Sequence, residues 1–251
     1  MSSPLPLEEL QSSFHGAGFD VFKPFPTHVY NASRPASCPE LSTYGRVHAM
    51  SVILGNSGHL WPIFLSSLMN SRPGDPLPSD PLDRYTEETV SRILRDHQAL
   101  RLPQACSVSF VHTHPGRPGF VDAIHASVIS GLAFNSPVAL LALHPALGPW
   151  FALRAVLSFD VDLEFPAPMR LSDPVPETEL ARLWDLKERI NPADFGRDWR
   201  SWLAFRDAVS EALGTQSHRY PEDMIAYHYT GDISILLGNR CSISCEYIVR
   251  T

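Results

Sequence analysis

The chain has 251 residues, 44% of them hydrophobic and 19% charged, so it can bury a sizeable core. Its formal net charge of −7 argues against a nucleic-acid partner, because such a protein needs a basic surface to replace phosphate counterions. The four cysteines do not suggest a disulfide framework, and the longest apolar run, 138–143, is far too short to span a bilayer. Residues 1–9 are polar and proline-rich, which predicts no signal peptide. We therefore expect a cytoplasmic protein with no membrane partner.

The first half of the chain is predicted to alternate helices and strands. Its expected elements are, in chain order, a helix over 5–14 ended by Gly16 and Gly18, an extended aromatic segment over 20–30, a strand over 48–54, a turn over 55–58 and a helix over 59–69. Pro81 then begins a longer helix, since proline suits a first helical turn. The buried stripe of this helix comprises Leu82, Tyr85, Val90, Ile93 and Leu94.

The second half continues this alternation. Its expected elements are, in chain order, a strand over 105–114, a helix over 120–134, two consecutive strands over 138–143 and 150–157 around a turn at 144–148, helices over 177–189 and 198–213, and two strand-like runs within 232–250. There are no repeats and no clear linker. Residues 1–251 are therefore predicted to form a single α/β or α+β domain.

Common catalytic signatures are absent from the sequence. It contains no G-x-G-x-x-G, no P-loop, no G-x-S-x-G elbow and no H-E-x-x-H. A nucleotide-binding dehydrogenase, a P-loop kinase and an α/β hydrolase are therefore disfavoured. Flavin binding stays open, because several flavin folds lack a short motif.

Two His-Pro turns could hold a metal or could form a polar rim. His112 and His114 lie on the same side of their predicted strand, and His125 or His144 could join them. Proline ending each strand, with histidine at a polar edge, explains the same pattern, and no nearby carboxylate completes a ligand set. The cysteine pair at 241 and 245 lacks a second pair. We predict no metal.

Arginines in aromatic surroundings indicate a ligand more strongly. Arg154 lies in an apolar strand, and Arg200 and Arg206 lie in the aromatic segment 198–207. A buried arginine needs either a fixed carboxylate or an anionic ligand as its partner. Asp207, beside Arg206, could be a purely structural partner, so both explanations stay open.

A series of short segments, each weak alone, is fairly specific in its order. The segments are Gly18 to Phe22, Tyr30-Asn31, Asp80 to Asp83, His114-Pro115, His144-Pro145, Gly148 to Arg154, Asp198 to Trp202, Phe205 to Val209, Arg219 to Asp223, Ala226-Tyr227 and Leu236 to Gly238. In this order and spacing the series resembles the cblC-type cobalamin-processing family, the cyanocobalamin reductase / alkylcobalamin dealkylase proteins. The likeness covers most of the chain, from residue 18 to residue 238.

The resemblance implies an α+β, nitroreductase-like sandwich, with an antiparallel sheet flanked by helices and a cap over a large cavity. Members of the family hold cobalamin in this cavity with its nucleotide tail detached from cobalt. They remove cyanide reductively with a reduced flavin, FMN or FAD, and they transfer alkyl groups to glutathione. The implied partners are this small-molecule ligand and a downstream cobalamin trafficking protein, with the chain a monomer or a homodimer.

The resemblance also implies roles for individual residues. Arg154 and Arg206 would hold the glutathione carboxylates, a role that suits their forked geometry. Tyr220 would lie near the upper face of cobalamin and His114 at the rim of the cavity, and these are the two expected catalytic residues. The cavity lining would include Ser107, Val108, Ser109, Phe110, Phe120, Val121, Ala142 and Leu153.

The sequence departs from the family pattern in three places. The turn after His114 is short, an arginine expected before 236–238 is missing, and the polar residue expected near Asp122 and Ala123 is replaced. Two alternatives to a cobalamin-processing enzyme therefore stay open. The altered turn favours an enzyme on the same scaffold that acts on another bulky substrate without cobalamin. The other alternative is a non-catalytic cobalamin carrier, which the basic residues at the thiol site disfavour.

Overall fold

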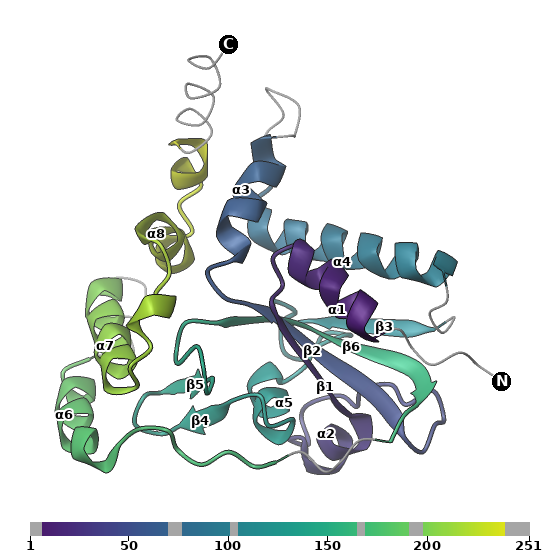
Figure 1. The fold of residues 1–251 in the computed structure, drawn as a ribbon, viewed down its shortest axis with the longest axis horizontal. Coiled ribbons are helices and arrows are strands. Elements are labelled where there is room, and N and C mark those ends of the chain that lie inside the picture. The colour runs from purple at the N-terminus through teal and green to yellow at the C-terminus, as the bar shows by residue number, and fades with distance from the viewer. Residues whose placement is uncertain (1–6, 70–76, 101–104, 165–168, 191–197, 239–251) are drawn as a thin grey trace.

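A four-stranded antiparallel sheet forms the centre of the protein (Figure 1). The computed structural model describes residues 7–69, 77–100, 105–164, 169–190 and 198–238. The strand order is β1 (Val21–Pro26), β2 (Ala49–Asn56), β6 (Ala152–Asp162) and β3 (Cys106–Phe110). All eight residues of β2 are buried, because β2 is an interior strand with helices on both of its faces.

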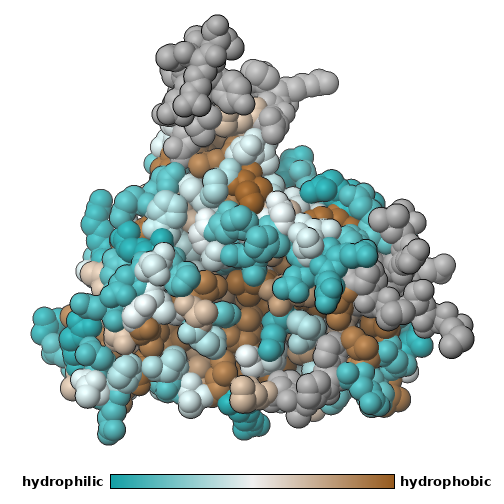
Figure 2. Space-filling view, in the orientation of Figure 1, coloured by the Kyte–Doolittle hydropathy of each residue, from teal (hydrophilic) through white to brown (hydrophobic). Residues whose placement is uncertain are grey.

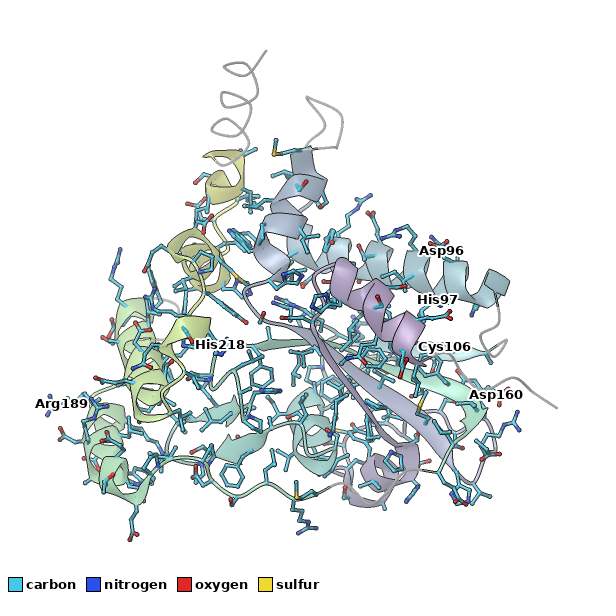
Figure 3. All side chains as sticks on the ribbon, in the orientation of Figure 1. Asp96, His97, Cys106, Asp160, Arg189 and His218 are labelled. Atoms are coloured by element: carbon cyan, nitrogen blue, oxygen red, sulfur yellow. The ribbon has the colours of Figure 1, made fainter. Side chains whose placement is uncertain are left out.

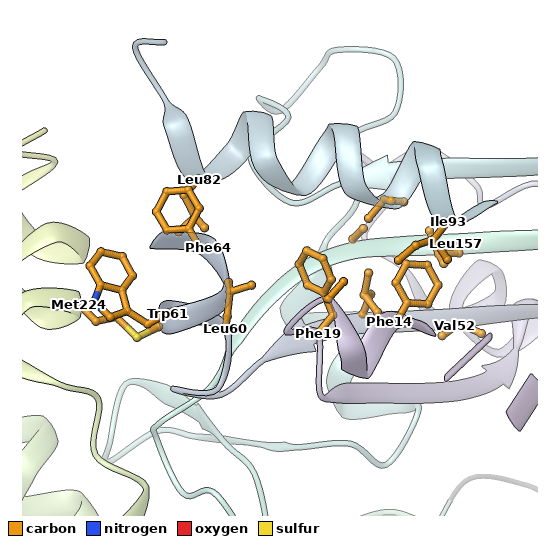
Figure 4. Packing of buried hydrophobic residues seen from close by; sticks show 14 of the residues in the cluster. Phe14, Phe19, Val52, Leu60, Trp61, Phe64, Leu82, Ile93, Leu157 and Met224 are labelled. Carbon is orange, nitrogen blue, oxygen red and sulfur yellow. The ribbon is translucent and has the colours of Figure 1, made fainter. Parts of the chain in front are cut away.

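Helices α1 (Leu7–Gly16), α3 (Leu60–Met69) and α4 (Pro81–Leu100) cover one face of the sheet (Figure 1). Their apolar side chains and those of α8 (Glu222–Thr230) pack on alternate residues of the strands. We call this cluster the first core. Figure 4 shows part of it, including Phe14, Phe19, Val52, Leu60, Trp61, Phe64, Leu82, Ile93, Leu157 and Met224.

Helices α2 (Thr27–Ser33) and α5 (Ala123–Ile129) lie on the opposite face (Figure 1). The second core, which includes Tyr30, Ile53 and Val156, fills this side. A chain of buried hydroxyls crosses it from Thr27 through Ser51 to Ser158, with both oxygen–oxygen distances at 2.9 Å. These hydrogen bonds satisfy polar groups that would otherwise be buried without partners.

The third core joins a short hairpin to two helices beside the sheet. The hairpin consists of β4 (Phe134–Ser136) and β5 (Leu141–Leu143), and the helices are α6 (Glu177–Glu188) and α7 (Trp199–Ala212). A 3-10 turn, η2 (Gln216–His218), connects α7 to α8. The predicted α+β class with an antiparallel sheet flanked by helices is thus confirmed.

Two predicted strands differ from the structure in length. The extended segment 20–30 ends at Pro26, where α2 begins, because proline cannot donate to a strand ladder and suits a helix start. The strand 105–114 ends at Phe110, where a turn closed by the hydrogen bond from Thr113 N to Phe110 O follows. His112 and His114 therefore lie in a loop, so the strand alternation expected for them was wrong.

Three predictions in the second half also need correction. The helix over 120–134 spans only α5, since Asp122 caps its start and Gly131, at φ +68°, ends it. The strand over 138–143 spans only β5, which pairs with β4, whereas the strand over 150–157 begins at Ala152 and extends to Asp162 as β6, paired with β2 and β3. Residues 234–238 are helical where a strand was expected, and 239–250 lie outside the described residues.

The turn before β6 depends on a glycine. Gly148 has φ +57°, and a Cβ there would collide with the Thr215 side chain. Thr215 cannot move freely, because its Oγ1 lies 3.0 Å from Ser210 Oγ, which accepts a 2.8 Å hydrogen bond from Trp150 Nε1. The turn and the end of α7 are therefore fixed against each other.

We predict that Gly148→Ala lowers the free energy of unfolding much more than Gly214→Ala, measured by urea titration. Gly214 has a similar φ of +67° but open space around it. The control should cost about 1 kcal/mol for its left-handed backbone alone. The collision at Gly148 should add roughly 1–3 kcal/mol. Equal losses in the two variants would contradict a steric role for this turn.

Candidate functional site

An open pocket of about 550 Å³ lies beside the second core. Its volume is within the usual range for small-molecule sites, roughly 300–1,000 Å³. Figure 2 shows apolar surface in the lower centre of the view, over the region of α5 and β5. The pocket is lined by Val111, Phe120, Val121, Asp122, Ala123, Ile124, Leu141, Ala142, Pro149, Phe151, Ala152, Leu153 and Arg206.

One wall of the pocket is the loop from β3 to α5. The Asp122 carboxylate accepts a 2.9 Å hydrogen bond from the backbone N–H of His125, which caps α5. The backbone N–H of Asp122 donates to the hydroxyl of Tyr30 at 3.2 Å. Tyr30 is fully buried, and this burial raises its pKa. The loop is therefore anchored to α2 at the point where it enters the pocket wall.

Arg206, on α7, is the one cation among the lining residues. Its Nε and Nη2 both donate to the backbone oxygen of Pro149, and its guanidinium carbon lies 4.4 Å from the ring centre of Trp150. The neighbouring Asp207 accepts instead from Arg219, at 2.7 Å. Within the described residues, Arg206 has no carboxylate partner, so Asp207 does not neutralise it.

Arg154 lies close behind the pocket, at an irregularity of the sheet. In the β2–β6 pairing, Leu54 faces Ala155 and Gly55 faces Leu153, which leaves Arg154 out of register as a bulge residue. Bulges commonly redirect a side chain beside a functional site. Its Nε donates to Asn56 Oδ1 at 2.7 Å, and its Nη2 lies 3.1 Å from His228 Nε2. Burial lowers the pKa of Arg154, and no carboxylate in the described part of the chain pairs with it.

Tyr220 stands between the two arginines. Its ring centre is 5.4 Å from the guanidinium carbon of Arg206 and 5.7 Å from the ring of His228. Its hydroxyl donates to the backbone oxygen of Asn56 at 3.4 Å. Burial raises the pKa of Tyr220 to about 12, so the phenol is neutral at physiological pH. Arg206 thus lies in the wall of the apolar pocket, with the neutral Tyr220 beside it and Arg154 behind the lining. Guanidinium groups are suited to binding carboxylates.

The His-Pro turns have separate local roles. His144 accepts hydrogen bonds from the backbone N–H groups of Ala146 and Leu147 at Nδ1, and burial lowers its pKa. His112 lies 2.8 Å from a Glu87 oxygen, and His114 is exposed. Among the described residues, no group of three or more His, Cys, Asp or Glu side chains could hold a metal. Cys241 and Cys245 lie outside those residues, and the absence of a metal stays a prediction.

The sequence is similar to two curated proteins named cyanocobalamin reductase / alkylcobalamin dealkylase. The Bos taurus protein is 26% identical over 237 residues, covering 89% of this chain and 77% of its own length. The Homo sapiens protein is 27% identical over 167 residues, covering 61% of this chain and 53% of its own length. No family model matches the chain.

The fold agrees with this likeness. The crystal structure of the C. elegans B12-trafficking protein CblC superposes with a TM-score of 0.69 over 92% of this chain and 94% of its own, at 15% identity. In sequence and in fold the chain is thus similar to the cblC-type cobalamin-processing proteins. The predicted resemblance is confirmed, while the low identity to the solved structure supports the fold alone. None of the described helices is long and apolar enough to cross a membrane.

Only some of the residues that the family resemblance implied for the cavity lie together in the pocket. Phe120, Val121, Ala142, Leu153 and Arg206 line the pocket. The four residues of β3 divide between the faces of the sheet, because side chains alternate along a strand. Val108 and Phe110 pack on the first core. Ser107 pairs with Ser158, on the face of the second core, and Ser109 shares that face.

The remaining expected residues lie around the pocket. Arg154 and Tyr220 are outside its lining: Tyr220 lies beside Arg206, and Arg154 directly follows the lining residue Leu153. His114 lies in the loop whose ends form the wall. Sequence reasoning missed Asn56 and His228, which bind Arg154. Asn56 carried a signal, since it is a polar residue directly after the apolar run of β2. His228 carried none, because its contact with β6 spans 74 residues.

We predict that acid destabilises the protein through His228. Burial, and next the nearby Arg154, lower its pKa to about 3, whereas an unfolded histidine titrates near 6.5. The unfolded state therefore binds the proton first, and stability present above pH 6.5 is lost as pH falls toward 3, by up to about 1.4 kcal/mol per pH unit. The check is urea titration between pH 6.5 and 4.5. His228→Gln, which has no titrating group, should remove this part of the slope; an unchanged slope would contradict it.

Proposed function

We propose that this chain removes the upper ligand of cobalamin, by reductive decyanation and by dealkylation with glutathione. The observation that carries the proposal is an open apolar pocket flanked by two arginines that have no carboxylate partner among the described residues, in a chain similar to this family. The apolar lining suits the flat corrin ring. The arginines suit an anionic co-substrate.

Cobalamin is larger than the pocket and extends over its open face. In this proposal the corrin lies on Phe120, Leu153 and Ala142, and the nucleotide tail is detached from cobalt. The same proposal includes the type of sandwich and the presence of a cap. The sheet and its helices form a nitroreductase-like sandwich, and the third core, with β4, β5, α6 and α7, serves as the cap over the cavity.

In dealkylation, the glutathione sulfur attacks the alkyl carbon, a carbon–sulfur bond forms, and the cobalt–carbon electron pair stays on cobalt. Arg154 and Arg206 hold the two carboxylates of glutathione and so orient the thiolate, which lowers the entropic cost of the step. Tyr220 stays neutral near the upper face, and His114 meets a polar part of cobalamin at the rim. The detached tail leaves cobalt without a lower ligand, which favours its lower oxidation states.

The described cysteines do not supply the thiolate themselves. Cys106, at the start of β3 (Figure 3), packs against the first core, and burial raises its pKa to about 12. Cys38 is buried on the other side of the sheet from that cluster, beside α2. A thiol held in place while it reacts must therefore come from outside this part of the chain.

Decyanation needs an electron donor, and we propose a reduced flavin, FMN or FAD. Phe120, Phe151 and Leu153 offer apolar contacts to a flat ring system, and Arg206 offers the cation that a flavin phosphate requires. A bound flavin would supply electrons. The residues of the chain would orient the reactants and exclude water.

The proposal also covers the location, the oligomeric state and the partner of the protein. We propose a cytoplasmic protein, a monomer or homodimer, that passes its product to a downstream cobalamin trafficking protein. The alternative is an enzyme on this scaffold with a different bulky substrate. The packing of Val108 and Phe110 against the first core favours the alternative, because it removes part of the expected corrin surface from the cavity.

The spectrum of cobalamin distinguishes these two functions. We predict that adding the protein shifts the visible absorption of cyanocobalamin, because tail detachment changes the cobalt ligands. Ala142→Phe fills the pocket and should raise the Kd at least tenfold. Ala146→Phe, in the exposed turn after β5, is the matched control and should leave the Kd within about twofold. No shift with the unaltered protein would favour the different substrate.

A substitution of Arg206 tests the proposed binding of glutathione separately from the binding of cobalamin. We predict that Arg206→Leu raises the KM for glutathione in methylcobalamin dealkylation at least tenfold, because it removes a carboxylate-binding fork. Arg200→Leu, on the same helix but stacked on Trp199 away from the pocket, should change this KM less than twofold. A fall in melting temperature without a change in KM would show a structural arginine. Arg154→Leu should give the same loss of thiol affinity.

A further inference from the structure

His228 presents a lone pair to Arg154. It is partly buried on α8, and its Nδ1 lies 3.0 Å from the backbone oxygen of Met224. A carbonyl oxygen can only accept, so Nδ1 carries the proton and donates. In the neutral ring Nε2 is then an acceptor, and it lies 3.1 Å from Nη2 of Arg154, which can only donate. The two contacts together select one tautomer.

Asn56 completes the same arrangement from the other side. Its Nδ2 donates to the backbone oxygen of Ser57 at 2.7 Å, which turns Oδ1 toward Nε of Arg154. Asn56 is fully buried at the end of β2, so its amide has little freedom to rotate away. Both acceptors that bind Arg154 are therefore neutral and are themselves held by backbone carbonyls.

We propose that His228 is the positioning residue of Arg154: it orients the guanidinium as a neutral acceptor and leaves the positive charge of Arg154 free for a ligand carboxylate. The inference rests on the proposed use of glutathione for the identity of that carboxylate. A carboxylate at this position would instead form an ion pair with Arg154 and compete with the ligand. The neutral ring thus orients the guanidinium without neutralising its positive charge.

The surroundings of His228 favour this role over proton transfer. Its ring lies 5.7 Å from that of Tyr220 and 6.2 Å from that of Tyr227, and both phenols are neutral because burial raises their pKa values. Burial and the nearby arginines disfavour a positive charge on the imidazole. His228 contacts Arg154 directly and, like Arg154, is absent from the pocket lining, so its effect on a ligand is exerted by orienting Arg154.

A matched pair of variants tests the inference. Gln and Glu at position 228 have the same shape and can both accept from Arg154, but only Glu carries a charge. By calorimetric titration with glutathione, His228→Gln should keep the Kd within about threefold of the unaltered protein. His228→Glu should raise it at least tenfold, as Arg154→Leu does. Equal affinities for the two variants, or a loss in both with native melting temperatures, would overturn the inference.

Nitrogen NMR of the unaltered protein gives a second measurement that needs neither variant nor ligand. The His228 ring should show a protonated Nδ1 and an unprotonated Nε2 at pH 7. Protonation at Nε2 would overturn the inference, because that nitrogen could not accept from Arg154. If the unaltered protein binds no glutathione, the thiol assignment fails, while the NMR spectrum still decides whether His228 holds Arg154.

Discussion

A partly buried guanidinium with no carboxylate partner among the described residues is the constraint on which the arrangement of the site depends. Burying an unpaired charge is costly, and proteins usually neutralise it or pair it. Arg154 instead receives two neutral acceptors, from Asn56 on β2 and His228 on α8. Because these elements belong to distant parts of the chain, the sheet and α8 must be in place before the charge is satisfied. The site is thus a product of the whole fold.

The β-bulge makes this position possible. In regular alternation residue 154 would share the face of Val156, in the second core, where an arginine would disrupt the packing. The extra residue turns the side chain toward α8. The same strand then continues as an interior strand of the sheet, hydrogen-bonded on both sides. One irregularity therefore separates the part of β6 that stabilises the fold from the part that positions the site.

The sequence predicted the fold class, the positions of the long helices and the family, because those depend on local patterns and on ordered motifs. Helices α3, α6 and α7 agree within a residue or two with the expected segments, and α4 begins at Pro81 as expected. The partners of β5 and β6 could not be predicted from the two apolar runs alone, because strand pairing depends on the whole sheet. The strand expected within 232–238 was wrong because short apolar runs fit a helix and a strand equally well.

The site was predicted less completely, for a physical reason visible in Arg206 and Asp207. Adjacent residues on a helix point in different directions, so sequence proximity could not tell whether they pair. In the structure Asp207 binds Arg219, and Arg206 stacks on Trp150 with its charge unpaired at the pocket. The chain thus holds two arginines beside one neutral tyrosine by means of aromatic rings, a backbone oxygen and neutral acceptors. Such partners fix direction without cancelling charge, which is the requirement of a site that must capture an anion and release it again.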